Sequence, residues 1–205
     1  DPVRFVGNRS SGKMGFALAA AARDRGAEVT LIHGPVALQA PYGVKTVAVE
    51  SCAAMQDAVL ESIAGADALV MAAAVADYRP ESAASHKIKK HEAGLALSLV
   101  RSPDILSAVA ERRAAGARLK AVVGFAAETR DLLANAREKL ARKRLELIVA
   151  NDVSAEDSGF EVDTNRVTLL DAAGGVQTLP LMPKPAVADR IMDRLAAMLR
   201  ESASR

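Results

Sequence analysis

The segment Asn8-Arg9-Ser10-Ser11-Gly12-Lys13-Met14-Gly15 is a polar, glycine-bearing turn that runs directly into an alanine-rich stretch over residues 16–25. Ser10 and Ser11 are candidate N-caps, because a serine hydroxyl accepts hydrogen bonds from the first amides of a helix. The first turn of a helix carries a partial positive charge, and Lys13 adds a full one. We therefore expect an anion site, for a phosphate or carboxylate, formed by Ser10, Ser11, Gly12, Lys13 and Met14.

The pattern of this turn matches no common nucleotide-binding motif. It is neither the dinucleotide fingerprint G-x-G-x-x-G nor a Walker A loop, in which the first glycine lies further from the Gly-Lys pair. Taken alone, the turn is equally compatible with an ordinary capped helix start in which Asn8 satisfies backbone groups. The choice between these interpretations depends on what the rest of the chain brings to the turn.

The chain after this first helix alternates short β-rich runs with helical segments. Residues 28–33 and 44–49 are rich in β-branched side chains, and Ser51 caps an amphipathic segment that continues to Ile63. Residues 68–72 are apolar without alternation, which is typical of a strand buried on both faces. This rhythm predicts parallel β-α units.

The second half of the sequence continues the pattern. Ser102 is a candidate cap with Pro103 at the first helical position, and a further helix is expected over residues 131–144. Strands are expected at 120–125 and 145–150, a β-hairpin at 166–170 and 176–179, and a closing helix whose apolar stripe holds Val187, Ile191, Leu195 and Met198. The predicted fold is α/β: a Rossmann-like, mostly parallel sheet flanked by helices, with an edge hairpin.

Composition restricts the class of protein. Half of the 205 residues are apolar, which argues against disorder, and the formal net charge of +2 is too small for an electrostatic nucleic-acid binder. The longest apolar run, residues 68–76, is far shorter than a membrane span. Cys52 is the single cysteine, which excludes an internal disulfide and fits a reducing compartment. We expect a cytoplasmic protein with no nucleic-acid or membrane partner.

The organisation of the chain favours one domain over residues 1–205, since we find no internal repeat and no low-complexity linker. The sequence begins without Met and almost on its most informative motif. We therefore expect this domain to be a piece of a longer polypeptide.

Residues 73–90 lack a clean period and follow the buried strand at 68–72. Ligands of open α/β sheets bind beyond the carboxyl ends of the strands, so we expect a site and a flap here. Asp77 and Lys87 are either part of a solvated loop, or Lys87 neutralises phosphate oxygens while Asp77 holds a sugar hydroxyl or a base. The alternating residues 95–100 are expected to form an arm or hairpin.

Other candidates also have two interpretations. Lys139, Arg142 and Lys143 share one face of a predicted helix, which by spacing alone favours an exposed face over a phosphate site. Phe125, at a strand end, is by default a core residue, although such a ring can stack on a nucleobase. The three histidines lack metal-ligand spacing with Cys52, and we assign no metal to side chains.

Several motifs occur together, in order and nearly end to end. They are Asn8 to Gly15, Ala73-Ala74-Val75-Ala76-Asp77-Tyr78-Arg79-Pro80, Lys87-Ile88-Lys89-Lys90, Pro103-Asp104-Ile105-Leu106, Val123-Gly124-Phe125-Ala126-Ala127-Glu128-Thr129, residues 139–143 and Val149-Ala150-Asn151-Asp152-Val153. This series resembles bacterial phosphopantothenoylcysteine synthetase, the synthetase half of the bifunctional coenzyme A biosynthesis protein. The other half of that protein is a flavin-dependent phosphopantothenoylcysteine decarboxylase, which uses FMN and would precede Asp1.

The resemblance implies a ligase that works in two steps. The carboxylate of 4′-phosphopantothenate attacks the α-phosphate of CTP, with Mg²⁺ as the metal, and gives an acyl-cytidylate and pyrophosphate. The amine of L-cysteine then attacks the acyl carbon, and CMP leaves. The family is dimeric, so the resemblance also implies a homodimer in which the partner subunit helps to close the site, and a fold with a flap or dimerisation arm.

The resemblance also implies roles for individual residues. Asn8 should contact the reacting acyl group, and Lys87 should serve catalysis and the nucleotide phosphates. The nucleotide site should comprise Met71, Ala72, Ala73, Asp77, Lys87, Pro103, Asp104, Ile105, Leu106 and Phe125, with Lys139 and Lys143 at the triphosphate.

Two other classes of function compete with the ligase. A Rossmann-type oxidoreductase would need the dinucleotide glycine fingerprint, which is missing. A noncatalytic nucleotide-binding scaffold would bind CTP without ever releasing pyrophosphate.

Overall fold

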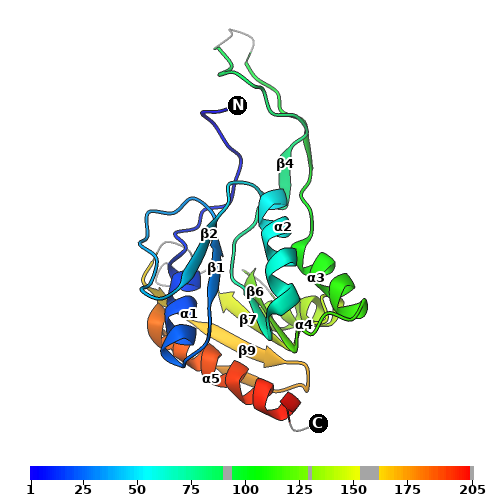
Figure 1. Cartoon of the computed structure of the whole chain (residues 1–205). Helices are drawn as coiled ribbons and strands as arrows, with labels where there is room; N and C mark the ends of the chain where they lie inside the picture. The colour runs from blue at the N-terminus through cyan, green and yellow to red at the C-terminus, as the bar shows by residue number, and fades with distance from the viewer. Residues whose placement is uncertain (90–93, 129–130, 153–161, 204–205) are drawn as a thin grey trace.

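The computed structural model of the chain describes residues 1–89, 94–128, 131–152 and 162–203. Its main sheet has five strands in the order β10-β9-β7-β6-β3 (Figure 1). These strands are β3 (Ala68–Met71), β6 (Ala121–Glu128), β7 (Leu147–Asp152), β9 (Val167–Asp171) and β10 (Val176–Thr178). The first three are parallel, whereas β9 and β10 form an antiparallel hairpin at the edge. The predicted α/β fold and its edge hairpin are confirmed.

Helices cover both faces of this sheet. On one face lie α1 (Lys13–Asp24) and α5 (Lys184–Ala203), and on the other lie α2 (Cys52–Ser62), α3 (Ile105–Ala114) and α4 (Leu132–Arg142) (Figure 1). A short 3-10 helix, η1 (Ile63–Gly65), follows α2. Alternate residues of β6 serve the two cores, since Val123 packs with the α1 and α5 side and Val122 with the other. The central strands are therefore buried on both faces, as their apolar sequences predict.

Among the described residues, six strands lie outside the main sheet, and four of them form two small sheets apart from the arm. The parallel pair β1 (Thr30–His33) and β2 (Lys45–Ala48) forms a separate two-stranded sheet beside α1 and α2. The sequence predicted both strands but not this separation, which depends on long-range pairing. An antiparallel pair, β8 (Thr164–Asn165) and β11 (Met182–Pro183), lies where α5 begins.

Two helix starts differ from the prediction. Gly12, not Ser10 or Ser11, is the N-cap of α1, with a φ of 75° that favours glycine. A Cβ at Gly12 would also lie 3.0 Å from Val36 Cγ1. Likewise Asp104, not Ser102, caps α3, because its carboxylate accepts a hydrogen bond of 3.0 Å from the amide of Ser107.

The predicted place of Pro103 at the first helical position is therefore wrong as well, because this proline precedes the Asp104 cap and lies outside α3. Helix α4 is shorter than predicted: Asp131 is its N-cap at a φ of 49°, and the helix ends at Arg142, before Arg144 with a φ of 52°. Such left-handed residues are typical of chain reversals at helix ends.

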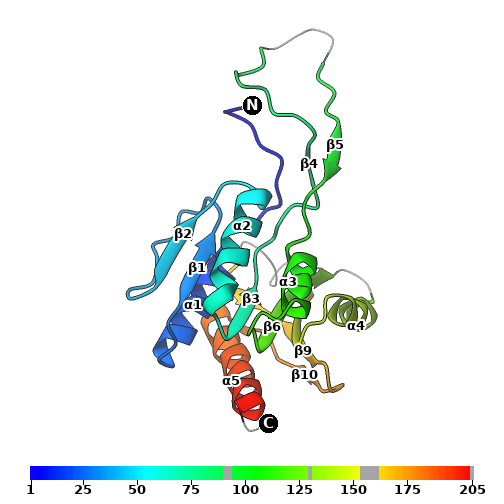
Figure 2. The ribbon, with the colours of Figure 1, turned by 45° about the vertical axis from the view of Figure 1, so that its right-hand side comes forward.

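An arm projects from the body, as Figure 2 shows. Its base is the antiparallel pair β4 (Tyr78–Pro80) and β5 (Leu99–Arg101). The N-terminal segment lies along it, since Asp1 Oδ2 accepts from the amide of Ile88 at 3.2 Å and Arg4 donates to the carbonyl of Ile88 at 2.8 Å. The predicted arm is confirmed as a hairpin, while its role in dimerisation stays a prediction.

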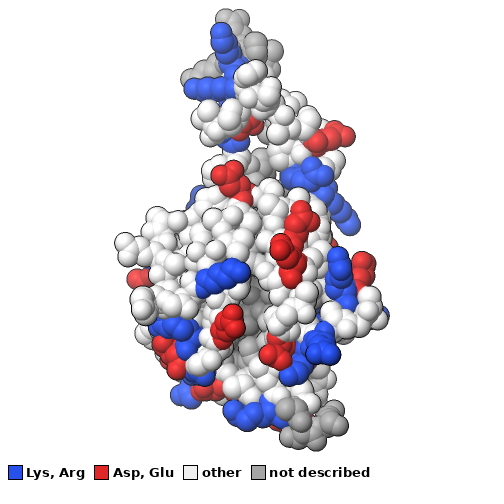
Figure 3. All heavy atoms as spheres, in the orientation of Figure 1, with Lys and Arg blue, Asp and Glu red and all other residues white. Residues whose placement is uncertain are grey.

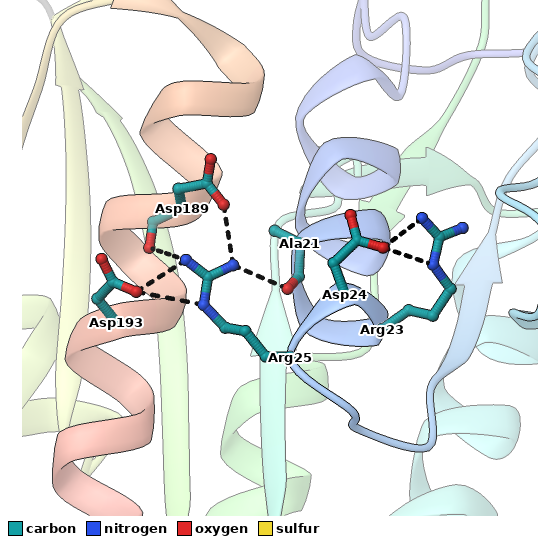
Figure 4. A network of polar contacts seen from close by, with 6 residues as sticks. All are labelled: Ala21, Arg23, Asp24, Arg25, Asp189 and Asp193. Carbon is teal, nitrogen blue, oxygen red and sulfur yellow. Dashed lines mark hydrogen bonds and ion pairs between the residues drawn. The ribbon is translucent and has the colours of Figure 1, made fainter.

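An arginine joins the two helices on one face of the sheet (Figure 4). Arg25, the C-cap of α1, donates to the carboxylates of Asp189 and Asp193 on α5 at 2.8 and 2.7 Å, and to the carbonyl of Ala21 at 2.9 Å. The bonds to the two carboxylates, that to Asp193 first, raise the pKa of the guanidinium. Arg25 thus fixes the end of α1 against α5.

Replacing Arg25 with alanine should lower the free energy of unfolding by about 1 kcal/mol, because the ion pairs are partly exposed and screened by solvent. For a chain of this length that corresponds to a fall of about 2–4 °C in the thermal midpoint. Arg23→Ala is the matched control, since Arg23 bonds to its neighbour Asp24 and to the carbonyl of Tyr42. Thermal denaturation that shows equal losses for both variants would contradict a specific α1–α5 link.

Candidate functional site

The carboxyl end of β3 lies beside the middle of β6, because Met71 is the register partner of Gly124 and β6 continues to Glu128. The chain leaves β3 through Ala72 and Ala73, and Phe125 follows Gly124 on β6. The predicted nucleotide residues Met71, Ala72 and Ala73 therefore lie where β3 ends, at the edge at which ligands of α/β folds bind. Phe125 is near them but lies within β6, not at a strand end as predicted.

Two hydrogen bonds bring further predicted segments to this edge. Asn8 Nδ2 donates to the carbonyl of Val75 at 3.2 Å, which joins the turn before α1 to the segment after β3. The amide of Ser102 donates to the carbonyl of Asp77 at 2.8 Å, which joins the same segment to the one that enters α3. Three stretches far apart in sequence thus meet beyond the strand ends.

Two lysines from the end of α4 reach the same region. Lys139 Nζ donates to the carbonyl of Phe125 at 2.7 Å. Lys143 Nζ contacts the carboxylate of Asp104 and the hydroxyl of Ser107, the latter at 2.8 Å. The side chain of Arg142 is 62% exposed and pairs with Glu138, so the lysines are not simply members of one solvated face. Lys139 and Lys143 thus lie close to predicted nucleotide segments, and their role at a triphosphate stays a prediction.

The ion pair with Lys143 changes the acidity of Asp104. Partial burial opposes ionisation, but the hydrogen bonds from Lys143 and from the Ser107 amide outweigh it, and the pKa of the carboxyl falls below its ordinary value of 3.8. A lowered folded-state pKa stabilises the fold fully above the unfolded value, and the contribution disappears as pH falls through the folded value.

Asp104→Asn should therefore be less stable than the parent at pH 7 by under about 1 kcal/mol, since the carboxylate is half exposed. Asparagine keeps the cap, so the difference measures the charge. Thermal midpoints from pH 7 down to pH 2 should converge below pH 4. A difference that persists at pH 2 would show that the charge is not responsible; Asp57→Asn, on the exposed face of α2, controls for the loss of one carboxylate.

Some predicted nucleotide residues do not offer their side chains. Ile105 and Leu106 are buried, with 4% and 9% of their surface exposed, in the core shared with α2 and α4. The carbonyl of Pro103 accepts from the Cys52 thiol at 3.4 Å, and burial raises the pKa of that thiol. Any contact of a ligand with Ile105 and Leu106 would have to use the backbone.

The turn before α1 contains a feature that the sequence did not predict. Lys13 Nζ, in the first turn of α1, pairs with Asp163 Oδ1 at 2.6 Å, and this bond lowers the pKa of Asp163. Lys184, only 3% exposed, donates to the carbonyl of Val162, and burial followed by the charge of Lys13 lowers its pKa. Asn165 Nδ2 lies 3.8 Å from the sulfur of Met14. A carboxylate thus already lies against the predicted anion-binding lysine.

Lys87 is not brought to the strand edge within one chain. It is exposed on the arm, one residue before Ile88, which bonds to the N-terminal segment. On the face seen in Figure 3, acidic and basic side chains are interspersed over the body, and basic side chains lie toward the tip of the arm. Lys87 and the exposed Lys89 belong to this arm. The catalytic role of Lys87 stays a prediction, and it requires that the arm reach a nucleotide site other than that of its own chain.

A cavity of about 440 Å³ lies at the opposite edge, where β6 and β7 begin. Arg113 lines it and donates to Glu146 at 2.7 Å and to the carbonyl of Leu119 at 3.2 Å. Glu146 also accepts from the amide of Val122 at 2.7 Å. These bonds join α3 to the two strands, so the cavity borders a structural ion pair.

Neither a metal-ligand cluster nor a membrane-spanning helix is found in the part of the chain that the structure describes. Within residues 1–89, 94–128, 131–152 and 162–203, no group of three His, Cys, Asp or Glu side chains is placed to hold a metal ion. No helix in those ranges has the length and apolarity that a bilayer crossing requires.

The fold and the convergence of backbone turns and lysines at the strand edge define a Rossmann-like α/β domain with a candidate site for an anionic ligand. The chain belongs to the family described as the DNA/pantothenate metabolism flavoprotein C-terminal domain, whose family model matches residues 1–199.

The chain is also similar to curated proteins of coenzyme A biosynthesis. The chain is 45% identical over 206 residues to the coenzyme A biosynthesis bifunctional protein CoaBC of Bacillus subtilis, covering 100% of this chain and 50% of the relative. Against CoaBC of Mycobacterium tuberculosis the identity is 47% over 207 residues, covering 97% of the chain and 49% of the relative. The chain therefore spans about half the length of the curated relatives it matches.

Solved structures agree with the fold. A crystal structure of the C-terminal domain of CoaBC matches with a TM-score of 0.82 and 39% identity, covering 98% of this chain and 89% of the other. The DNA/pantothenate metabolism flavoprotein of Streptococcus pneumoniae matches with a TM-score of 0.79 and 23% identity, covering 96% and 93%. The second likeness bears on the fold alone.

Proposed function

We propose that this chain is a CTP-dependent ligase that joins 4′-phosphopantothenate to L-cysteine in coenzyme A biosynthesis. The observation that carries the proposal is the meeting, in a chain of this family, of the Asn8 turn, the segment after β3 and the entry to α3 at one sheet edge. Lys139 and Lys143 reach that edge from α4. The arrangement offers cations for phosphates beside backbone positions that a nucleoside can approach closely.

The first chemical step needs a carboxylate to become an acyl donor. The carboxylate oxygen of 4′-phosphopantothenate bonds to the α-phosphorus of CTP, the bond to the bridging oxygen breaks, and pyrophosphate leaves. Lys139 and Lys143 would stabilise the charge that develops on the departing phosphates. Mg²⁺ would enter with CTP on the phosphate oxygens, the hard ligands that it prefers.

The second step transfers the acyl group. The amine of L-cysteine attacks the acyl carbon, the amide forms, CMP leaves and the amine loses a proton. Asn8 would hold the reacting acyl group, since its amide both donates and accepts. Asp77, exposed after β3, would accept hydrogen bonds from a ribose hydroxyl or the base. Lys13 in the first turn of α1 would bind a phosphate or carboxylate group of a substrate, which would replace Asp163 as its ion-pair partner.

The arm supports a homodimer as the working form. Leu95, Leu97 and Leu99 alternate along it and are 57%, 53% and 46% exposed, an apolar row that a second copy would cover. Lys87 on the same arm would then reach the site of the partner. We propose this arrangement because Lys87 lies apart from the strand edge of its own chain.

The relatives are bifunctional proteins about twice as long as this chain. We propose that the natural protein also carries the flavin-dependent decarboxylase, with FMN, and that both activities operate in the cytoplasm. FMN would belong to that other domain.

Pyrophosphate release tests the function directly. The purified chain with CTP, Mg²⁺, 4′-phosphopantothenate and cysteine should release one pyrophosphate for each product formed. Binding of CTP without pyrophosphate would favour a noncatalytic scaffold, and tight binding of a nicotinamide cofactor with indifference to CTP would favour an oxidoreductase. Either result would overturn the ligase.

A further inference from the structure

Ser102 connects the arm to α3, directly after β5 and two residues before the cap of that helix. Its amide is paired with the carbonyl of Asp77 at 2.8 Å. Its Oγ, in contrast, is buried and has no hydrogen-bond partner among the residues that the structure describes. The backbone amide of Ser102 is therefore hydrogen-bonded, whereas, in the described part of the chain, its side-chain hydroxyl is not.

The hydroxyl has no structural task that explains its burial. A serine before Pro-Asp looks like a helix cap, but the carboxylate of Asp104 fills that role. A buried hydroxyl without a partner destabilises the fold, because it loses its bonds to water and gains nothing in return. Unsatisfied groups of this kind in native proteins call for a specific reason, such as a bound ligand.

The location of Ser102 suggests which ligand. Its amide bond ties it to Asp77, and the chain continues from it into Pro103 and Asp104, so it lies between two segments of the proposed nucleotide site. The residue as a whole is only partly buried, although Oγ is covered. A change between the staggered χ1 rotamers is therefore a small motion that can re-aim the hydroxyl.

We propose that Ser102 is a further nucleotide-binding residue, whose hydroxyl forms a hydrogen bond to the nucleoside portion of CTP. This inference rests on the proposed function. The nucleoside portion is favoured over the phosphates because the amide of Ser102 is bonded to Asp77, whose exposed carboxylate repels anions and suits a sugar hydroxyl or a base. A neutral hydroxyl suits a ribose hydroxyl or the polar edge of a base.

The opposite effects of one substitution on affinity and on stability test the proposal. Ser102→Ala should weaken binding of both CTP and CMP by the same factor, about fivefold to tenfold, as expected for one neutral hydrogen bond. The thermal midpoint without nucleotide should stay the same or rise, because an unpaired buried hydroxyl has been removed. Titration calorimetry and thermal denaturation of the same samples supply both measurements.

Three variants complete the design. Ser102→Thr keeps a hydroxyl and should retain most of the affinity. Ser102→Cys keeps about the same side-chain volume, but its thiol is a poor donor, so it should lose as much affinity as the alanine variant. It also tests the proposal if Ser102→Ala fails to fold. Ser62→Ala, at the end of α2, controls for the loss of a serine elsewhere.

Several outcomes would overturn the proposal. Unchanged affinity for both nucleotides in Ser102→Ala would do so, and a lower thermal midpoint with unchanged affinity would show a structural role instead. A loss confined to CTP would place the contact at the phosphates. Failure of the unmutated chain to bind CTP would reject the proposed function itself. Equal binding of CTP by parent and variant would reject only the role of Ser102.

Discussion

Lys87→Gln should reduce the rate of pyrophosphate release by about 10²–10³-fold, as expected for the loss of a group that stabilises charge developing in the transition state. Glutamine keeps a polar, hydrogen-bonding side chain, somewhat shorter than lysine, but removes its positive charge. The thermal midpoint should not change, because Lys87 is exposed on the arm, away from both cores. Steady-state kinetics with CTP and 4′-phosphopantothenate measure the loss.

Lys89→Gln is the matched control, because Lys89 is exposed two residues further along the same arm. It should retain most of the activity. Equal losses in the two variants would mean that the arm supplies only a diffuse positive field, and an unchanged rate for Lys87→Gln would remove Lys87 from the mechanism.

Mixing inactive chains tests whether the arm acts on the partner. Chains with Lys87→Gln and chains with Asn8→Asp should together regain about a quarter of the parent activity if Lys87 serves the partner's site, since half of the dimers are mixed and each holds one intact site. No recovery is expected if Asn8 and Lys87 of the same chain act together. The experiment needs refolding or subunit exchange, and the homodimers of each variant supply the baseline.

Local sequence was sufficient for the parts of the fold that depend on short-range patterns. The apolar runs that form β3 and β7 lack alternation, and this alone indicates burial on both faces. The same patterns also predicted a site in the segment after β3, beyond the carboxyl end of that strand, whereas the place of Phe125 in this site came only from the family resemblance.

Choices between near-equal local options were not predictable in the same way. Ser10 and Gly12 both fit a helix start, as do Ser102 and Asp104, and the structure selects the glycine at positive φ and the carboxylate. Cap preferences among such residues differ by small free energies, so packing decides. In the first case that packing includes Val36, which leaves little room for a Cβ at Gly12.

Contacts between distant residues lay beyond any local pattern. The Lys13–Asp163 pair and the Arg25–Asp193 pair join residues more than 140 positions apart. Lys13 was singled out by its place in the first turn of a helix, but nothing in the sequence marked Asp163, Arg25 or Asp193 as partners in ion pairs. The burial of Lys184 at the start of α5 was equally hidden from sequence patterns.

Asn8→Asp should lower kcat/KM for 4′-phosphopantothenate by about 10²-fold, because it places a negative charge where a carboxylate and phosphates must meet. Asn8 Nδ2 donates to the carbonyl of Val75 at 3.2 Å, and an ionised aspartate can only accept. The substitution therefore replaces a bond between the α1 turn and the segment after β3 with repulsion.

Asn8→Ala separates the two causes, since it removes the donor without adding a charge. Alanine should reduce kcat/KM about tenfold less than aspartate does, because a lost neutral hydrogen bond is weaker than an opposing charge. If the two variants were equally impaired, the bond to Val75 rather than the field at the acyl group would explain the role of Asn8. If both retained the parent kinetics, Asn8 would lie outside the reacting centre, and the turn before α1 would serve only to start its helix.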